Sequence, residues 1–109
     1  MALEKILIVE EDLSLRSSLL EGLKRREFEV ITAETGVQAL SLCSEYPFDL
    51  IFCPIMPTET SGLEIVARAK QRNPQTIVIL TTSFAHVALA TEAMRHGAFN
   101  YLITPFSQE

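Results

Sequence analysis

The stretch that decides the fold is Ile6-Leu7-Ile8-Val9-Glu10-Glu11-Asp12, near the amino terminus. Three of its four apolar residues are β-branched, and a short continuous apolar run of this kind is typical of a strand buried on both faces of a sheet. Three carboxylates then end the run abruptly. Strands with this composition occur in parallel sheets that helices cover on both sides, so the stretch predicts an α/β protein.

Four further strand-like runs follow, and helical patterns alternate with them. The expected strands are Ile6–Val9, Phe28–Thr32, Asp49–Cys53, Ile77–Leu80 and Phe99–Ile103, and the expected helices are Leu13–Arg26, Gly36–Ser44, Leu63–Arg72 and Ala85–His96. In the first helix, leucines at every fourth position form an apolar stripe, and Arg16 belongs to the charged remainder of the surface. Five strands alternating with four helices predict a doubly wound parallel sheet of order 2-1-3-4-5.

The bulk composition describes a single globular domain over residues 1–109. Hydrophobic residues make up 48% of the chain and charged residues 21%, and no apolar run approaches the roughly 20 residues that span a bilayer. We therefore expect a cytoplasmic protein with no membrane contact. A net charge of −5 argues against nucleic-acid binding by this domain. Cys43 and Cys53 lack metal-ligand spacing, so we expect both to be reduced packing residues.

The site of such a fold lies beyond the carboxyl ends of its strands, where the winding reverses between the first and third strands. The residues expected at this rim are Glu10, Glu11, Pro54, Thr82 and Thr104. Adjacent carboxylates repel each other, and a hard cation such as Mg²⁺ would relieve that repulsion. A solvated acidic turn that begins the next helix is the alternative. A fifth helix should cover the last edge of the sheet, and we interpret it as missing or truncated here.

The order of these motifs resembles the receiver domains of two-component response regulators, from Lys5 through Phe106. Four segments carry the resemblance: 6–12, 49–62, 77–82 and Gly97-Ala-Phe-Asn-Tyr-Leu-Ile-Thr-Pro-Phe106. The last is most similar to receivers of nitrogen-regulator-type enhancer-binding activators. The resemblance implies a flavodoxin-like fold and, in the family, transfer of a phosphoryl group onto an aspartate of the receiver itself.

Carried over residue by residue, the resemblance implies a degenerate receiver. The two acids that hold Mg²⁺ in the family fall on Glu10 and Glu11, each one methylene longer than aspartate. The acceptor aspartate falls on Pro54, eight residues before Gly62, and proline has no nucleophilic side-chain atom. The family's lysine falls on Thr104, so the cation that would neutralise the phosphoryl oxygens is absent.

The resemblance therefore predicts a non-enzymatic, phosphorylation-independent signalling and protein-interaction module that regulates an attached transcriptional output domain. Thr82 and Tyr101 occupy the family's switch positions. No cofactor is expected, and any Mg²⁺ bound at Glu10 and Glu11 should be held weakly. The expected partner is a second copy, joined through the fourth helix, the fifth strand and the missing fifth helix. The pattern gives no support for a histidine kinase as partner.

Two other functions remain open at this stage. The first is an active phosphoacceptor that uses an unconventional residue, although Cys53 should point to the opposite face of its strand and Glu59 lies in a loop. The second is a flavodoxin-like flavin binder, whose phosphate needs backbone N–H groups in the loop after the first strand. Three carboxylates occupy that loop here. His86 and His96 are expected to be surface residues rather than ligands.

Overall fold

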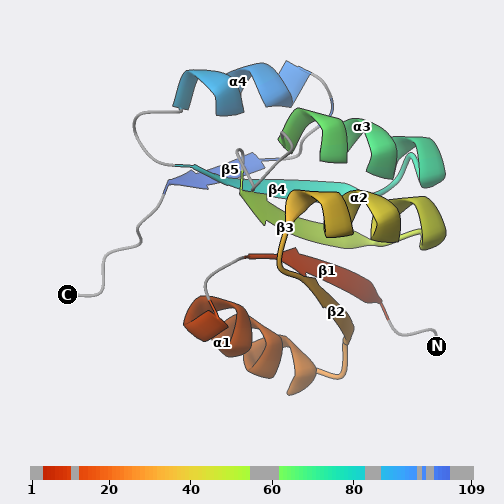
Figure 1. Ribbon diagram of the computed structural model, residues 1–109, viewed down its shortest axis with the longest axis vertical. Coiled ribbons are helices and arrows are strands. Elements are labelled where there is room, and N and C mark those ends of the chain that lie inside the picture. The colour runs from red at the N-terminus through yellow and green to blue at the C-terminus, as the bar shows by residue number, and fades with distance from the viewer. Residues whose placement is uncertain are drawn as a thin grey trace.

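The computed structural model describes residues 4–10, 13–54, 62–82, 87–95, 97 and 100–103. Its elements are β1 (Lys5–Val9), α1 (Leu13–Lys24), β2 (Glu29–Ala33), α2 (Gly36–Glu45), β3 (Leu50–Pro54), α3 (Gly62–Arg72), β4 (Ile77–Thr82), α4 (Val87–Arg95) and β5 (Asn100–Ile103). Figure 1 shows strands and helices alternating along the chain. Among the described residues, no helix has both the length and the apolar composition needed to cross a membrane.

The strands form one parallel sheet in the order β2-β1-β3-β4-β5. The predicted α/β class and the parallel order of the first four strands are confirmed. Beyond them, β5 pairs with β4, with Asn100 opposite Ile79. The expected fifth helix falls outside the described residues.

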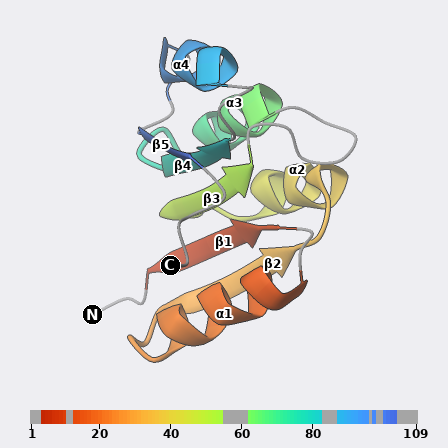
Figure 2. The same cartoon turned by 90° about the vertical axis from the view of Figure 1, so that its left-hand side faces the viewer.

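The crossover connections decide which helix covers which face of the sheet. The chain moves from β1 out to β2 and then back across β1 to β3 and β4. Because such crossovers are right-handed, α1 lies on one face, and α2, α3 and α4 lie on the other. Figures 1 and 2 show α1 apart from the group of three helices. The carboxyl ends of β1 and β3 therefore meet where the winding reverses.

The main core lies between the sheet and the two helices α2 and α3. Its buried members are Leu7, Val9, Ala33, Ala39, Cys43, Phe48, Ile51, Cys53, Ile65, Val66, Ala69, Val78 and Leu80. In β1, Ile6 and Ile8 are buried as well, so both faces of this strand are covered, as its apolar run predicts. Both cysteines are free and buried, in agreement with their predicted packing role.

Several element boundaries differ from the sequence prediction. Helix α1 ends at Lys24 rather than Arg26, because Glu27 adopts a positive φ of 68° and its N–H donates to the Lys24 carbonyl at 3.0 Å. This left-handed residue closes the helix. Strand β3 includes Pro54, and β4 continues to Thr82. The apolar pattern does not reveal these strand ends, because the pairing of the neighbouring strands extends them.

Candidate functional site

The candidate site is the rim formed by the carboxyl ends of the central strands. Pro54 is the last residue of β3 and lies opposite Thr81 of β4. The pairing of β1 with β3 ends with Ile8 opposite Phe52, and Glu10 directly follows β1. Glu10 follows β1 and Pro54 ends β3, so both belong to the carboxyl-terminal edge of the parallel sheet.

The remaining predicted site residues are placed only in part. Thr82 is the last residue of β4, where its Cα is opposite that of Ile103, and Tyr101 is opposite Leu80 inside β5. The positions of Glu11 and Thr104 fall outside the described residues, and so do those of Glu59, His86 and His96. Their predicted roles remain predictions.

Pro54 leaves the end of β3 without a reactive group. Its ring is half-buried, and proline supplies neither a side-chain oxygen nor a backbone N–H. Pro54 is the last residue of β3, so the N–H that proline lacks belongs to the end of the strand rather than to its middle. The position opposite Thr81 therefore offers only the carbon atoms of the proline ring and a backbone carbonyl.

Arg16 is the unexpected member of the rim. Its Nη1 donates to the Glu10 carbonyl oxygen at 2.8 Å, and its Nη2 donates to Glu34 Oε2 at 3.2 Å. Only 12% of its side chain is exposed, so the prediction of Arg16 as a surface charge is wrong. Because its main partner is a backbone carbonyl, no pairing of residue types in the sequence could have indicated this contact.

A capping network extends this contact to the start of α2. The Thr35 side chain accepts a hydrogen bond from the Gln38 N–H at 3.1 Å, and the Gln38 side chain accepts one from the Glu34 N–H at 2.7 Å. This arrangement is a variant of the reciprocal helix cap. Because Arg16 contacts Glu34, the first turns of α1 and α2 are linked across the ends of β1 and β2.

Cys53 immediately precedes Pro54, the residue at the position of the family's acceptor. It is 1% exposed and belongs to the core cluster. Burial raises the pKa of its thiol well above the usual value, and the neighbouring Cys43 and Glu10 raise it further. The thiol donates to the Pro54 carbonyl at 3.1 Å. Because the thiolate is the reactive form of cysteine, this buried protonated thiol is a poor nucleophile.

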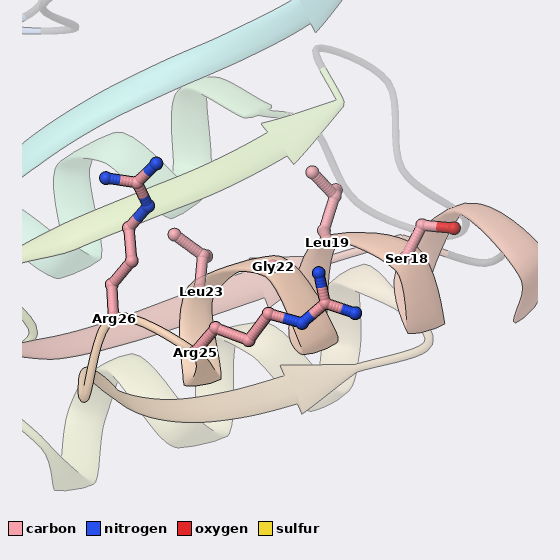
Figure 3. A pocket seen from close by; sticks show the side chains of 6 residues that line it. All are labelled: Ser18, Leu19, Gly22, Leu23, Arg25 and Arg26. Carbon is pink, nitrogen blue, oxygen red and sulfur yellow. The ribbon is translucent and has the colours of Figure 1, made fainter.

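A shallow hollow lies along α1, away from the rim. Its lining residues are Ser18, Leu19, Gly22, Leu23, Arg25 and Arg26. In Figure 3, Leu19 and Leu23 project from the same side of the helix, and Arg25 and Arg26 extend from the turn that follows it. The first turn of α1 follows the end of β1, so its last turn lies toward the opposite edge of the sheet. The hollow takes no part in the rim.

A doubly wound parallel sheet with its polar rim at the carboxyl ends of β1, β3 and β4 defines a receiver-like α/β domain. The chain belongs to the response regulator receiver domain family, whose model matches residues 6–109. Transcriptional regulatory protein ZraR of Klebsiella oxytoca is 37% identical over 92% of this chain and 23% of its own length. Regulatory protein AtoC of Escherichia coli is 34% identical over 96% of this chain and 23% of its own length.

The fold also resembles solved structures of the family. One is a response regulator protein from Burkholderia pseudomallei, solved with a phosphorylated aspartic acid, a calcium ion and citrate. It is 28% identical, with a TM-score of 0.83, and the match covers 95% of this chain and 61% of that one. The chain spans about a quarter of the length of the curated relatives named above.

The described residues do not fit the magnesium site that the family implies. In the family, the third carboxylate belongs to the acceptor aspartate, and Pro54 provides none. Among the described residues, no group of three histidine, cysteine, aspartate or glutamate side chains is placed to hold a metal ion. In addition, the positive charge of Arg16 already lies 2.8 Å from the Glu10 carbonyl.

Proposed function

We propose that this chain is a receiver domain that regulates an attached transcriptional output domain without being phosphorylated. The single observation that carries the proposal is Pro54 at the end of β3, opposite Thr81 of β4. The relatives named above are transcriptional regulators about four times as long as the matched segment. Their names and their greater length support a regulatory output domain in addition to the receiver.

The chemistry of phosphoryl transfer supports the proposal. The protein contributes mainly positioning and electrostatic stabilisation, so the reaction needs an acceptor oxygen with cations around it. Pro54 supplies no oxygen nucleophile, and Thr104 replaces the lysine of the family. Cys53 cannot substitute, because its thiol is buried and protonated. We infer that no aspartyl phosphate forms, that the domain is not an enzyme, and that no histidine kinase needs to act on it.

The proposal includes weak or negligible Mg²⁺ binding and no other cofactor. Glu10 and Glu11 keep the charge of the family's acidic pair, but each is one methylene too long for a close-fitting octahedral ion. The missing acceptor carboxylate removes a further ligand. Arg16 lowers the affinity again, because it places a positive charge at the same edge.

The test is an amide NMR titration with Mg²⁺ and then with beryllofluoride, a phosphoryl mimic that needs an acceptor carboxylate. Pro54→Asp/Thr104→Lys is the matched comparison. We expect the native chain to stay silent and the reconstituted chain to shift at the ends of β1, β3 and β4. Shifts in the native chain that reach Thr82 and Tyr101 would show an unconventional acceptor, and the proposal would be wrong.

We further propose that the protein is cytoplasmic. We also propose that it forms a homodimer through α4, β5 and the helix expected after β5. Ala88, Thr91 and Met94 of α4 are exposed, and Met94 is an exposed large apolar residue. The molar mass of a chain extended beyond Glu109 tests this. Met94→Glu should favour the monomer, whereas Arg72→Glu on the exposed surface of α3 should have no effect. A strict monomer at high concentration contradicts the dimer.

A further inference from the structure

Gly97, between α4 and β5 in the sequence, lies directly against side chains of α3. This turn residue has a φ of +113°, a conformation that side chains disfavour. A Cβ added there would lie 3.4 Å from Cε of Lys70 and 3.8 Å from Cγ1 of Val66. The Gly97 N–H donates to the Met94 carbonyl at 3.3 Å. Gly97 therefore lies against the aliphatic part of the Lys70 side chain, two residues after the end of α4.

The far end of Lys70 is held by the connection between α3 and β4. Its Nζ donates to the Thr76 carbonyl at 2.6 Å and to the Pro74 carbonyl at 3.4 Å. Thr76 is 1% exposed, and its hydroxyl donates to the Phe48 carbonyl at 2.6 Å. The lysine ammonium is thus bound to a segment that is itself held beside the start of β3.

We propose that Lys70 is a positioning residue that sets where the α4–β5 turn lies. Its ammonium fixes the direction of the side chain, and its aliphatic part supports the turn at Gly97. Because the turn joins α4 to β5, its position determines how these two elements are presented to a partner. This last consequence rests on the proposed function, in which α4 and β5 form the dimer surface.

The inferred contact lies at the opposite edge of the sheet from the rim. Lys70 and Gly97 lie near the points where β4 and β5 begin, whereas Pro54 and Glu10 lie where β3 and β1 end. A change at Lys70 would therefore reach the α4–β5 surface without any change at Pro54. In a receiver that lacks an acceptor, this is a route to that surface that requires no phosphoryl group.

The test compares Lys70→Ala, Lys70→Arg and Arg72→Ala by amide hydrogen exchange in the whole chain. Arg72 is the control, because it is exposed on the same helix. Lys70→Ala should speed exchange at Gly97 and in residues 100–103 by about tenfold, through easier local opening. Exchange in β1 should change less than twofold. Lys70→Arg keeps both an aliphatic part and a cation, so it should restore slow exchange.

Two results would overturn the inference. The first is exchange at Gly97 and β5 that is the same in Lys70→Ala as in Arg72→Ala. The second is a failure of Lys70→Arg to restore exchange in β5. If Lys70→Ala does not fold, Lys70→Gln serves the same comparison. This readout does not require a dimer, so failure of the proposed dimer and failure of the Lys70 contact can be told apart.

Discussion

Arg16 makes a contact whose removal has a calculable cost. Arg16→Met keeps most of the aliphatic length and removes the guanidinium that donates to the Glu10 carbonyl at 2.8 Å. A hydrogen bond from a charged group contributes about 1.5–3 kcal/mol. The ion pair to Glu34 adds about 0.5 kcal/mol or less, because 69% of the Glu34 side chain is exposed. We expect a loss of about 2 kcal/mol, which lowers the melting temperature by about 10 °C.

The assay is urea and thermal unfolding of the wild type, Arg16→Met, Glu34→Gln and the double variant. Glu34→Gln should cost about 0.5 kcal/mol or less, since it weakens only the exposed ion pair. The double variant should be close to Arg16→Met alone. If Glu34→Gln destabilises as much as Arg16→Met, the ion pair rather than the carbonyl bond carries the energy. A loss below about 0.5 kcal/mol in Arg16→Met would refute the reasoning altogether.

Three further predictions concern the backbone angle of Glu27, the hydrogen bond of Thr76 and the pKa of Cys43. Glu27→Gly should raise the free energy of unfolding by about 0.5–1 kcal/mol, because Glu27 has a φ of 68°; an unchanged urea midpoint would contradict this. Thr76→Val should lower it by about 1 kcal/mol, because Phe48 loses the bond at 2.6 Å but keeps the one from Asn73; unfolding of Asn73→Ala provides the comparison. Burial raises the pKa of the Cys43 thiol from 9.0 to about 11. The buried, protonated thiol therefore contributes fully to the stability of the fold below pH 9, and this contribution is lost as the pH rises through 11. The stability difference between wild type and Cys43→Ala should therefore shrink by about 2 kcal/mol from pH 8 to pH 11, and a constant difference would contradict the raised pKa.

Much of the fold could be predicted from the sequence because apolar runs decide it. Ile6 to Val9 gives a fully buried strand, and Ile77 to Leu80 gives another strand of the sheet. The alternation of strands and helices then limits the topology, because right-handed crossovers leave few arrangements. The ends of elements were less predictable. Glu27 ends α1 because its φ is positive, and a glutamate in the sequence does not predict a positive φ.

The contacts made by long cationic side chains could not be predicted. Arg16 donates to the carbonyl of Glu10, and Lys70 donates to the carbonyls of Pro74 and Thr76. Every residue carries such a carbonyl, so the sequence does not distinguish the acceptors. Their positions exist only after the strands have paired and the helices have packed. Arg16 therefore looked like an ordinary charge on the polar side of a helix, although its side chain is mostly buried.

Adjacent residues of β3 serve different purposes, because one packs in the core and the next lies at the position of the family's acceptor. Cys53 and Pro54 are neighbours in β3, but Cys53 packs in the core and Pro54 lies half-buried at the rim. Proline in place of the family's aspartate at position 54 therefore removes a carboxylate without changing the buried residues Ile51, Cys53 and Leu80. Proline is the last residue of the strand, so the N–H that it lacks is not one from the middle of β3. The same reasoning requires Pro54→Asp to fold, so the proposed loss of phosphoryl chemistry is compatible with an intact sheet and core.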